Sequence, residues 1–225
     1  MSECKMCSLR ENSFNPCIEG VGEDNAKIMF IQDSPDDLDD KNFMPFSGKS
    51  CNALRKSISN RGIPLKEVYF TSLVRCVCED KEVPTPCISA CSHYLEEEIK
   101  RVDPEIIVPT GNKSLRFCTG RVGLTKIRGN AQKIDLLGKQ RIVLPMMNPK
   151  MVSTKPAYKD FILKDLDTLQ DLYINGMTEV VGVTYKYFEA VADVTKEIVR
   201  MKNESKRIVF DLETTGKSPY MDYSK

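Results

Sequence analysis

Short apolar runs alternate with helical patterns along most of the chain. Residues 27–32, 67–74 and 105–109 are apolar or β-branched and are typical of buried strands. A segment that ends at about Asn60 and another over residues 88–102 have apolar side chains at helical spacing. This alternation predicts an α/β fold, a three-layer α/β/α sandwich around a mostly parallel sheet.

Two further elements complete the predicted sandwich. Residues 127–147 alternate between apolar and polar side chains and contain two glycines, which indicates a hairpin ending in a strand over residues 141–146. Residues 159–173 have one apolar face and predict a helix. Ligands of such sheets bind at the carboxyl ends of the strands. The loops expected at that edge are residues 33–37, 72–76 and 147–150.

The pattern restarts after Asn175. A strand, a helix and a strand are predicted over residues 180–188, 191–201 and 207–211. We therefore expect two domains, residues 1–175 and an incomplete second domain over residues 176–225.

Composition narrows the class of protein. The chain is 41% hydrophobic and 29% charged, with a formal net charge of +1, so it lacks the basic excess that would attract nucleic acid over long range. No apolar run approaches the roughly 20 residues of a membrane span, and the first residues carry no export signal. We expect a cytoplasmic protein without a membrane partner.

The cysteines are the first candidates for chemistry. Nine of them in a chain without an export signal favour reduced thiols or a metal site over disulfides. Cys4 and Cys7 form a Cys-x-x-Cys turn that can direct two thiolates at one metal, and Cys76 and Cys91 follow later. Because His93 is the only histidine, we expect a cysteine-only site, interpreted as an iron–sulfur cluster. Unconnected reduced thiols, or zinc in a protein-interaction scaffold, are the alternatives.

Further motifs accompany these cysteines in a fixed order. They are QDSPDDLDD (residues 32–40), MPFSG (44–48), TSLVRC (71–76), CSHYL (91–95) and NPK (148–150). In order and spacing, residues 1 to about 172 resemble the family 4 uracil-DNA glycosylases, an iron–sulfur branch of that superfamily. In that family CxxC is followed by GExPGxxED, GRPFxGxxG, TNxxKC, CxPYL and HPS.

The resemblance implies a uracil-DNA glycosylase-like fold and a defined set of site residues. It implies a [4Fe–4S] cluster on Cys4, Cys7, Cys76 and Cys91. It places degenerate catalytic positions at Asp33 and Asn148, and a base pocket at Phe46 and Ser72. The cysteines that do not belong to the family's motifs are interpreted as structural or surface thiols: Cys17, Cys51, Cys78, Cys87 and Cys118.

The departures from the motifs concern the chemistry. Asp33 replaces a Glu and is shorter by one methylene, Ser72 replaces an Asn, and Asn148 replaces a His that would be the strongest donor. Gln32 and Asp36 replace two glycines. An acidic rim that repels phosphate is expected from Asp36, Asp37, Asp39 and Asp40. We expect a catalytically silent DNA-binding domain; the alternative is an active glycosylase for uracil or a modified pyrimidine in base-excision repair.

A second motif, DLETTG, follows the last predicted strand. Its carboxylates, Asp211 and Glu213, can both face one metal site, and the motif resembles the first motif of the 3′–5′ exonuclease domain in family A DNA polymerases. Mg²⁺ would bind only if further sequence completed that domain. A glycosylase-like domain ahead of an exonuclease is typical of certain bacteriophage DNA polymerases. We therefore expect an N-terminal fragment of such a polymerase, acting in DNA replication in the host cytoplasm.

Basic residues near strand ends or helix N-termini are the candidates for phosphate contact. They are Lys49, Lys113, Arg128 and Lys150. The expected partners are DNA and either the remainder of a polymerase or other replication proteins.

Overall fold

The computed structural model describes residues 4–78, 82–177 and 191–204. The chain divides into two units, Met1–Thr178 and Glu179–Lys225, which are considered separately. The described part of the second unit is helix α7 (Val191–Glu204), where the sequence predicts a helix; the strands predicted over residues 180–188 and 207–211 lie outside the described residues. None of the described helices is long and apolar enough to cross a membrane.

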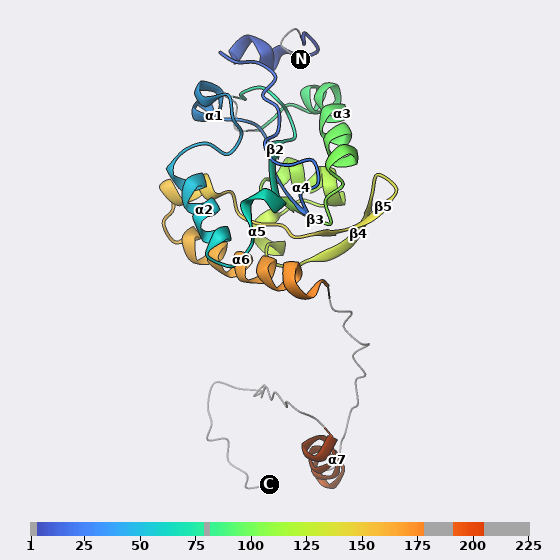
Figure 1. The fold of residues 1–225 in the computed structure, drawn as a ribbon. Helices are drawn as coiled ribbons and strands as arrows, with labels where there is room; N and C mark the ends of the chain where they lie inside the picture. Colours follow the sequence, from blue (N-terminus) through green and yellow to red (C-terminus); the bar gives the residue numbers. More distant parts are fainter. Residues whose placement is uncertain (1–3, 79–81, 178–190, 205–225) are drawn as a thin grey trace, which may run out of the picture. The chain divides into compact units, whose positions relative to one another are not determined.

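A five-stranded sheet forms the centre of the first unit (Figure 1), in the order β2-β1-β3-β5-β4. Strands β1 (Ile28–Gln32), β2 (Val68–Ser72), β3 (Ile106–Pro109) and β5 (Lys139–Val143) are parallel, whereas β4 (Gln132–Leu136) pairs antiparallel with β5. The prediction of an α/β fold with a mostly parallel sheet is confirmed.

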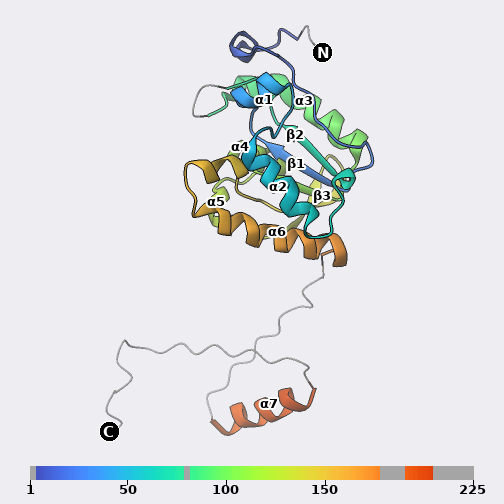
Figure 2. The same ribbon diagram turned by 60° about the vertical axis from the view of Figure 1, so that its left-hand side comes forward.

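Helices cover both faces of the sheet because its central strands are apolar on both sides. The main ones are α2 (Lys49–Ser59), α3 (Thr85–Val102), α4 (Asn112–Thr119) and α6 (Tyr158–Asn175). Phe30 of β1 belongs to a core with residues of α2 and α6, and these two helices lie together in Figure 2. Its neighbour Met29 points to the opposite face and packs with residues of α3.

The β4–β5 hairpin closes one edge of the sheet. Its turn residues Leu137 and Gly138 have φ values of 57° and 79°, as a tight two-residue turn between antiparallel strands requires. The strand predicted over residues 141–146 ends earlier, at Val143. The chain beyond it still follows β3, because the N–H groups of Leu144 and Met146 donate to backbone oxygens there.

Two short helices were not predicted. They are α1 (Asp37–Asn42) and α5 (Leu124–Ile127), and α1 begins at the end of the loop expected over residues 33–37. The Asp36 carboxylate accepts the N–H groups of Leu38 and Asp39, and Asp39 in turn accepts the N–H of Asp36. This reciprocal capping box satisfies the free donors of a helix start and stabilises α1 despite its acidic composition. Three 3₁₀ turns, η1 (Ser8–Asn12), η2 (Leu65–Glu67) and η3 (Pro149–Ser153), complete the elements of the described residues.

Candidate functional site

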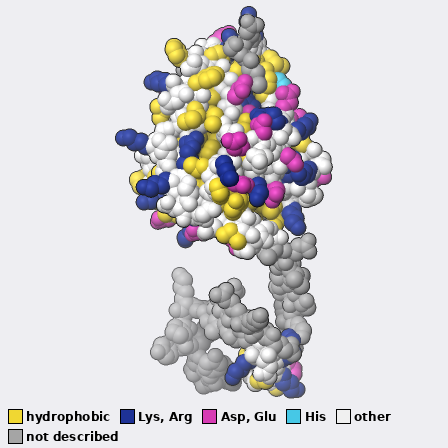
Figure 3. All heavy atoms as spheres, viewed as in Figure 1, with side chains coloured by type: hydrophobic (Ala, Val, Ile, Leu, Met, Phe, Trp, Pro, Cys, Tyr) yellow, Lys and Arg dark blue, Asp and Glu magenta, His cyan; other side chains and the backbone are white. Residues whose placement is uncertain are grey.

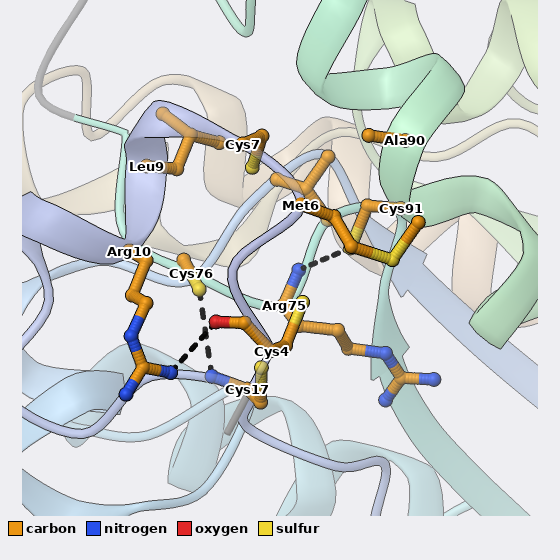
Figure 4. Close-up of a pocket in the computed structure, with 11 residues that line it drawn as sticks. Cys4, Met6, Cys7, Leu9, Arg10, Cys17, Arg75, Cys76, Ala90 and Cys91 are labelled. Atoms are coloured by element: carbon orange, nitrogen blue, oxygen red, sulfur yellow. Dashed lines mark hydrogen bonds between the residues drawn. The ribbon is translucent and has the colours of Figure 1, made fainter. Parts of the chain in front are cut away.

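The four cysteines predicted as ligands line one pocket at the N-terminal end of the unit (Figure 4). Cys4 and Cys7 precede η1, Cys76 follows β2, and Cys91 lies on α3. Three segments far apart in sequence therefore meet at sulfur atoms. A fifth cysteine, Cys17, lines the same pocket.

Backbone N–H groups point at two of these sulfurs. The Arg75 N–H lies 3.3 Å from Cys91 Sγ, and the Cys17 N–H lies 3.4 Å from Cys76 Sγ. Donors aimed at sulfur favour the thiolate form, which is the form that binds metal. Among the described side chains, no three Cys, His, Asp or Glu groups converge on one point closely enough to hold a single ion. A four-iron cluster is held by four thiolates, and this donor set of four thiols around one pocket fits it.

Burial favours the protonated form of two thiols in this pocket. It raises the pKa of Cys91 to about 11 and that of Cys17 to about 12. Metal binding at these sulfurs would therefore displace protons and would depend on pH.

The remaining cysteines separate into two groups. Cys87 belongs to the same hydrophobic cluster as Cys76 and Cys91, and its sulfur lies 3.8 Å from Ser8 Oγ. Cys78 packs against this cluster. Cys51 and Cys118 are buried in the cores on the two faces of the sheet. The structure thus brings Cys17 to the predicted ligands, although its sequence spacing carries no signal of this.

A second cavity, of about 510 Å³, opens at the carboxyl ends of the strands. Asp33 after β1, Thr110 after β3, and Asn148 and Lys150 after β5 all line it. Both predicted catalytic positions are therefore brought together at the edge of the sheet where ligands of α/β folds bind.

The Asp33 carboxylate is engaged by the start of helix α4. It accepts the backbone N–H groups of Lys113 at 3.1 Å and Ser114 at 2.7 Å, and the Ser114 hydroxyl at 2.8 Å. Gly111 permits this approach, because a Cβ at that position would lie 2.1 Å from Asp33 Oδ1. The carboxylate therefore satisfies a helix N-terminus, the usual role of a capping side chain.

Asn148 has a similar local role. Its side-chain oxygen accepts the Lys150 N–H at 2.9 Å and caps η3. The cap explains why an Asn suits this position in a loop that begins Asn-Pro.

Phe46 and Ser72, the predicted base-pocket residues, are buried. Phe46 is 0% exposed and packs against Phe30 and Phe70, with ring centroids 6.2 and 5.3 Å away. Ser72 is 2% exposed, and its hydroxyl accepts the side-chain N–H of Gln32 at 3.0 Å. In the described part of the chain, neither residue lines the cavity that contains Asp33 and Asn148.

The expected acidic rim is corrected by the structure, since two of its four members are buried. Asp39 accepts the N–H of Ser47 at 2.6 Å and the Lys150 ammonium at 2.6 Å. Asp40 accepts the backbone N–H groups of Phe14 and Asn15 at 2.6 and 2.7 Å. Each carboxylate accepts backbone N–H groups of a neighbouring loop and so holds that loop in place.

Three of the four candidate DNA-contact residues have acidic partners. Lys113 pairs with Glu82 at 2.9 Å. Lys150 contacts Asp36 at 2.8 Å as well as Asp39. Arg128 pairs with Asp165 at 2.6 Å. Lys49 is exposed at the start of α2 and makes no ion pair with any residue that the structure describes. On the face of the first unit seen in Figure 3, basic and acidic side chains are interspersed.

The exonuclease-like carboxylates Asp211 and Glu213 lie outside the described residues. Their predicted role, and the Mg²⁺ that depends on it, remain predictions.

Comparison with known proteins supports the glycosylase-like interpretation. The family model of the uracil DNA glycosylase superfamily matches residues 19–169. The type-4 uracil-DNA glycosylase of Thermotoga maritima is 29% identical over 172 residues, covering 74% of this chain and 88% of that protein. The type-4 enzyme of Sulfurisphaera tokodaii is 29% identical over 178 residues, covering 76% of this chain and 80% of that protein.

A DNA polymerase of Bacillus phage SP01 is 34% identical over 218 residues, which cover 93% of this chain. This chain spans 23% of the length of that polymerase. Since the superfamily model matches most of the chain, the chain belongs to the uracil DNA glycosylase superfamily.

Proposed function

We propose that this chain acts in DNA replication as part of a phage-type DNA polymerase, with residues 1–175 forming a DNA-binding iron–sulfur domain that has lost glycosylase chemistry. The similarity to the phage polymerase covers 93% of the chain, so it extends past the superfamily match into residues 179–225. This extension favours a polymerase context over that of a free-standing glycosylase. An exonuclease-like role for Asp211 and Glu213 is part of the same proposal.

One observation carries the loss of chemistry: the engagement of Asp33. A carboxylate that orients an attacking water must direct a lone pair of one of its oxygens at that water. The first turn of α4 already supplies three hydrogen bonds to Asp33, two to Oδ1 and one to Oδ2, and these hold the carboxylate toward the helix. Asn148 in place of a His also lacks a donor of comparable strength for the oxygen that gains charge as the bond breaks.

The cysteine pocket supports the iron–sulfur part of the proposal. Cys4, Cys7, Cys76 and Cys91 would each supply one thiolate to a [4Fe–4S] cluster. Bound there, the cluster would cross-link the N-terminal segment, the loop after β2 and helix α3. Its main effect would be on the stability of the domain.

DNA contact is proposed for Lys49 first. It is exposed at the N-terminus of α2, and no described acidic residue pairs with it. Helix N-termini and lysines are ordinary partners of phosphate. The other three candidates would first have to break an ion pair. Lys113 is paired with Glu82, Arg128 with Asp165, and Lys150 with both Asp36 and Asp39.

A second candidate function is an active glycosylase. The observation that favours it is the shared cavity of about 510 Å³, which Asp33 and Asn148 both line. In that case Asp33 would exchange one bond with α4 for a water molecule when a base enters.

Base release from uracil-containing DNA separates the two functions. The purified protein is incubated with single- and double-stranded uracil-containing oligonucleotides, and free uracil and abasic sites are measured alongside binding by fluorescence anisotropy. We expect binding without base release. Base release that the Asp33→Ala variant loses would overturn the silent assignment, and absence of binding to either oligonucleotide would overturn the DNA-binding role.

Iron analysis tests the cofactor independently of activity. We expect iron and acid-labile sulfide in the protein purified without oxygen, with a visible absorbance that bleaches on reduction. Cys76→Ser should lose both the iron and the absorbance. Cys118→Ser should keep them, because Cys118 is buried in a different hydrophobic core from Cys76 and Cys91. Zinc in place of iron would contradict the cluster.

A further inference from the structure

The side chain of Gln32 has an unusual position for a polar group. Gln32 ends β1, pairs in register with Ser72 at the end of β2, and is 1% exposed. Phe30 lies two residues earlier on the same face of β1 and contacts the ring of Phe46. Gln32 therefore lies at the carboxyl ends of two parallel strands, and two residues before it β1 contributes Phe30 to a cluster of aromatic rings.

Two neighbours hold this amide. Gln32 Nε2 donates to Asp39 Oδ2 at 2.7 Å and to Ser72 Oγ at 3.0 Å. The buried Asp39 oxygens accept hydrogen bonds, so they fix which way the amide points, because the reverse orientation would bring two acceptors together. Gln32 Oε1 is buried without a hydrogen-bond partner among the described residues. A buried acceptor without a hydrogen-bond partner is costly.

Asp39 connects this amide to the surrounding loops. Its Oδ1 accepts the N–H of Ser47, the residue after Phe46. Its Oδ2 also accepts the Lys150 ammonium at 2.6 Å, and Lys150 contacts Asp36 as well. Lys150 lines the open cavity, whereas Gln32 and Ser72 do not, in the part of the chain that is described. The Asp39–Lys150 pair thus lies between the cavity and the buried amide.

A carboxamide and the edge of a pyrimidine share their recognition chemistry. Each is planar and presents an N–H donor next to a carbonyl acceptor. A carboxylate and a hydroxyl beside aromatic rings are suitable partners for either group.

We propose that Gln32 occupies, from within the chain, the position that a pyrimidine would take beside Phe46, Ser72 and Asp39. This inference rests on the proposed loss of glycosylase chemistry and deepens it: the pocket is filled by a side chain, in addition to having altered catalytic positions. A glycine at position 32 would remove the whole occupant and leave the partners Asp39 and Ser72 facing an empty space.

Chemical complementation tests the proposal with free uracil as the probe. Gln32→Gly should be destabilised, and millimolar uracil should raise its Tm in a saturable way by about 3 °C, because a ligand that binds only the folded state stabilises it. The wild-type Tm should not respond. The matched control is Gln170→Gly. Gln170 lies on α6, and its side-chain amide donates to the backbone carbonyl of Arg61. This variant should not respond to uracil either.

Two results would overturn the proposal. One is a wild-type Tm that rises with uracil as much as that of the variant, which would mean that the pocket is open. The other is a Gln32→Gly protein that gives no response up to the solubility limit of uracil. If Gln32→Gly does not fold, Gln32→Ala replaces it under the same criteria.

Hydrogen exchange of the wild-type side-chain amide gives an independent measure. The Gln32 Nε2 protons should exchange at least about tenfold more slowly than those of exposed Gln140, because two buried acceptors hold them. Equal exchange rates would contradict the buried occupant. Neither measurement depends on base release from DNA, so failure here is distinguishable from failure of the proposed function.

Discussion

Asp33 and Ser114 are joined by two hydrogen bonds: Asp33 Oδ1 accepts the backbone N–H of Ser114 at 2.7 Å and its hydroxyl at 2.8 Å. Asp33, the predicted degenerate catalytic position, is thus built into the start of a helix 81 positions later in the chain. The contact that stabilises α4 therefore competes with an attacking water for Oδ1.

The first prediction concerns this bond. Asp33→Ala should lower the free energy of unfolding by about 1–2 kcal/mol, since it removes a charged cap from a helix N-terminus. Urea unfolding followed by circular dichroism measures the loss. Asp37→Ala is the control, because Asp37 is exposed in the first turn of α1. Equal stability of wild type and Asp33→Ala would contradict the capping role.

Lys150 is the counter-ion of a fully buried carboxylate. Lys150→Ala should destabilise the protein by about 1–4 kcal/mol, between the values for exposed and buried pairs, because Asp39 is 0% exposed whereas the Lys150 side chain is 21% exposed. Thermal and urea unfolding measure the change. Lys155→Ala removes a lysine that lies over the Tyr158 ring and should cost much less. Similar losses in both variants would argue against the Asp39 pairing.

The buried pair of Arg75 and Glu98 should be the most sensitive ion pair. Arg75 Nη1 lies 2.8 Å from Glu98 Oε1, and Glu98 also accepts the hydroxyls of Tyr69 and Thr71. Glu98→Ala leaves the Arg75 charge buried and should cost about 3–5 kcal/mol. The control Glu97→Ala alters an exposed neighbour on the same helix. A loss below about 1 kcal/mol for Glu98→Ala would refute this ranking.

Asp103 gives a pH-dependent prediction. Hydrogen bonds from Lys139 and then Arg141 lower the pKa of its carboxyl. A carboxyl with a lowered folded-state pKa stabilises the fold above its ordinary pKa, and this stabilisation is lost as pH falls through the folded-state value. Asp103→Asn should therefore be less stable than wild type by under about 1 kcal/mol near neutral pH, and the gap should close as the pH falls from the ordinary pKa of an Asp carboxyl through the lowered folded-state value.

Urea midpoints across that pH range measure the gap. Asn suits this position because the φ of residue 103 is 52°, a left-handed value that Asn tolerates. A gap that is constant with pH would rule out the two ion pairs as its cause.

DNA binding should separate Lys49 from Arg128. Lys49→Ala should weaken binding and reduce the salt dependence of the affinity by about one phosphate contact. Arg128→Ala should chiefly lower stability, because Arg128 holds Asp165 and the Phe161 carbonyl. Fluorescence anisotropy at several salt concentrations measures both. Lys56→Ala, an exposed lysine near the end of the same helix as Lys49, is the control, and an equal effect there would indicate nonspecific charge.

Local pattern was sufficient for most of the elements. The strands around Phe30, Phe70 and Val108 are short apolar runs bounded by turns, so their periodicity identified them before any contact was known. Helix α1 was missed because its signal is a capping box within an acidic run, and such a run is equally typical of a turn.

The sequence by itself determined the order of strands and helices, the ordered motifs of the superfamily and the four cysteines that now line one pocket. Only the tertiary structure decided which polar groups are already engaged. Gln32 meets Ser72 across 40 residues, and Lys150 meets Asp39 across 111. Such contacts depend on strand register and on how loops converge at the sheet edge, and local periodicity carries no information about either.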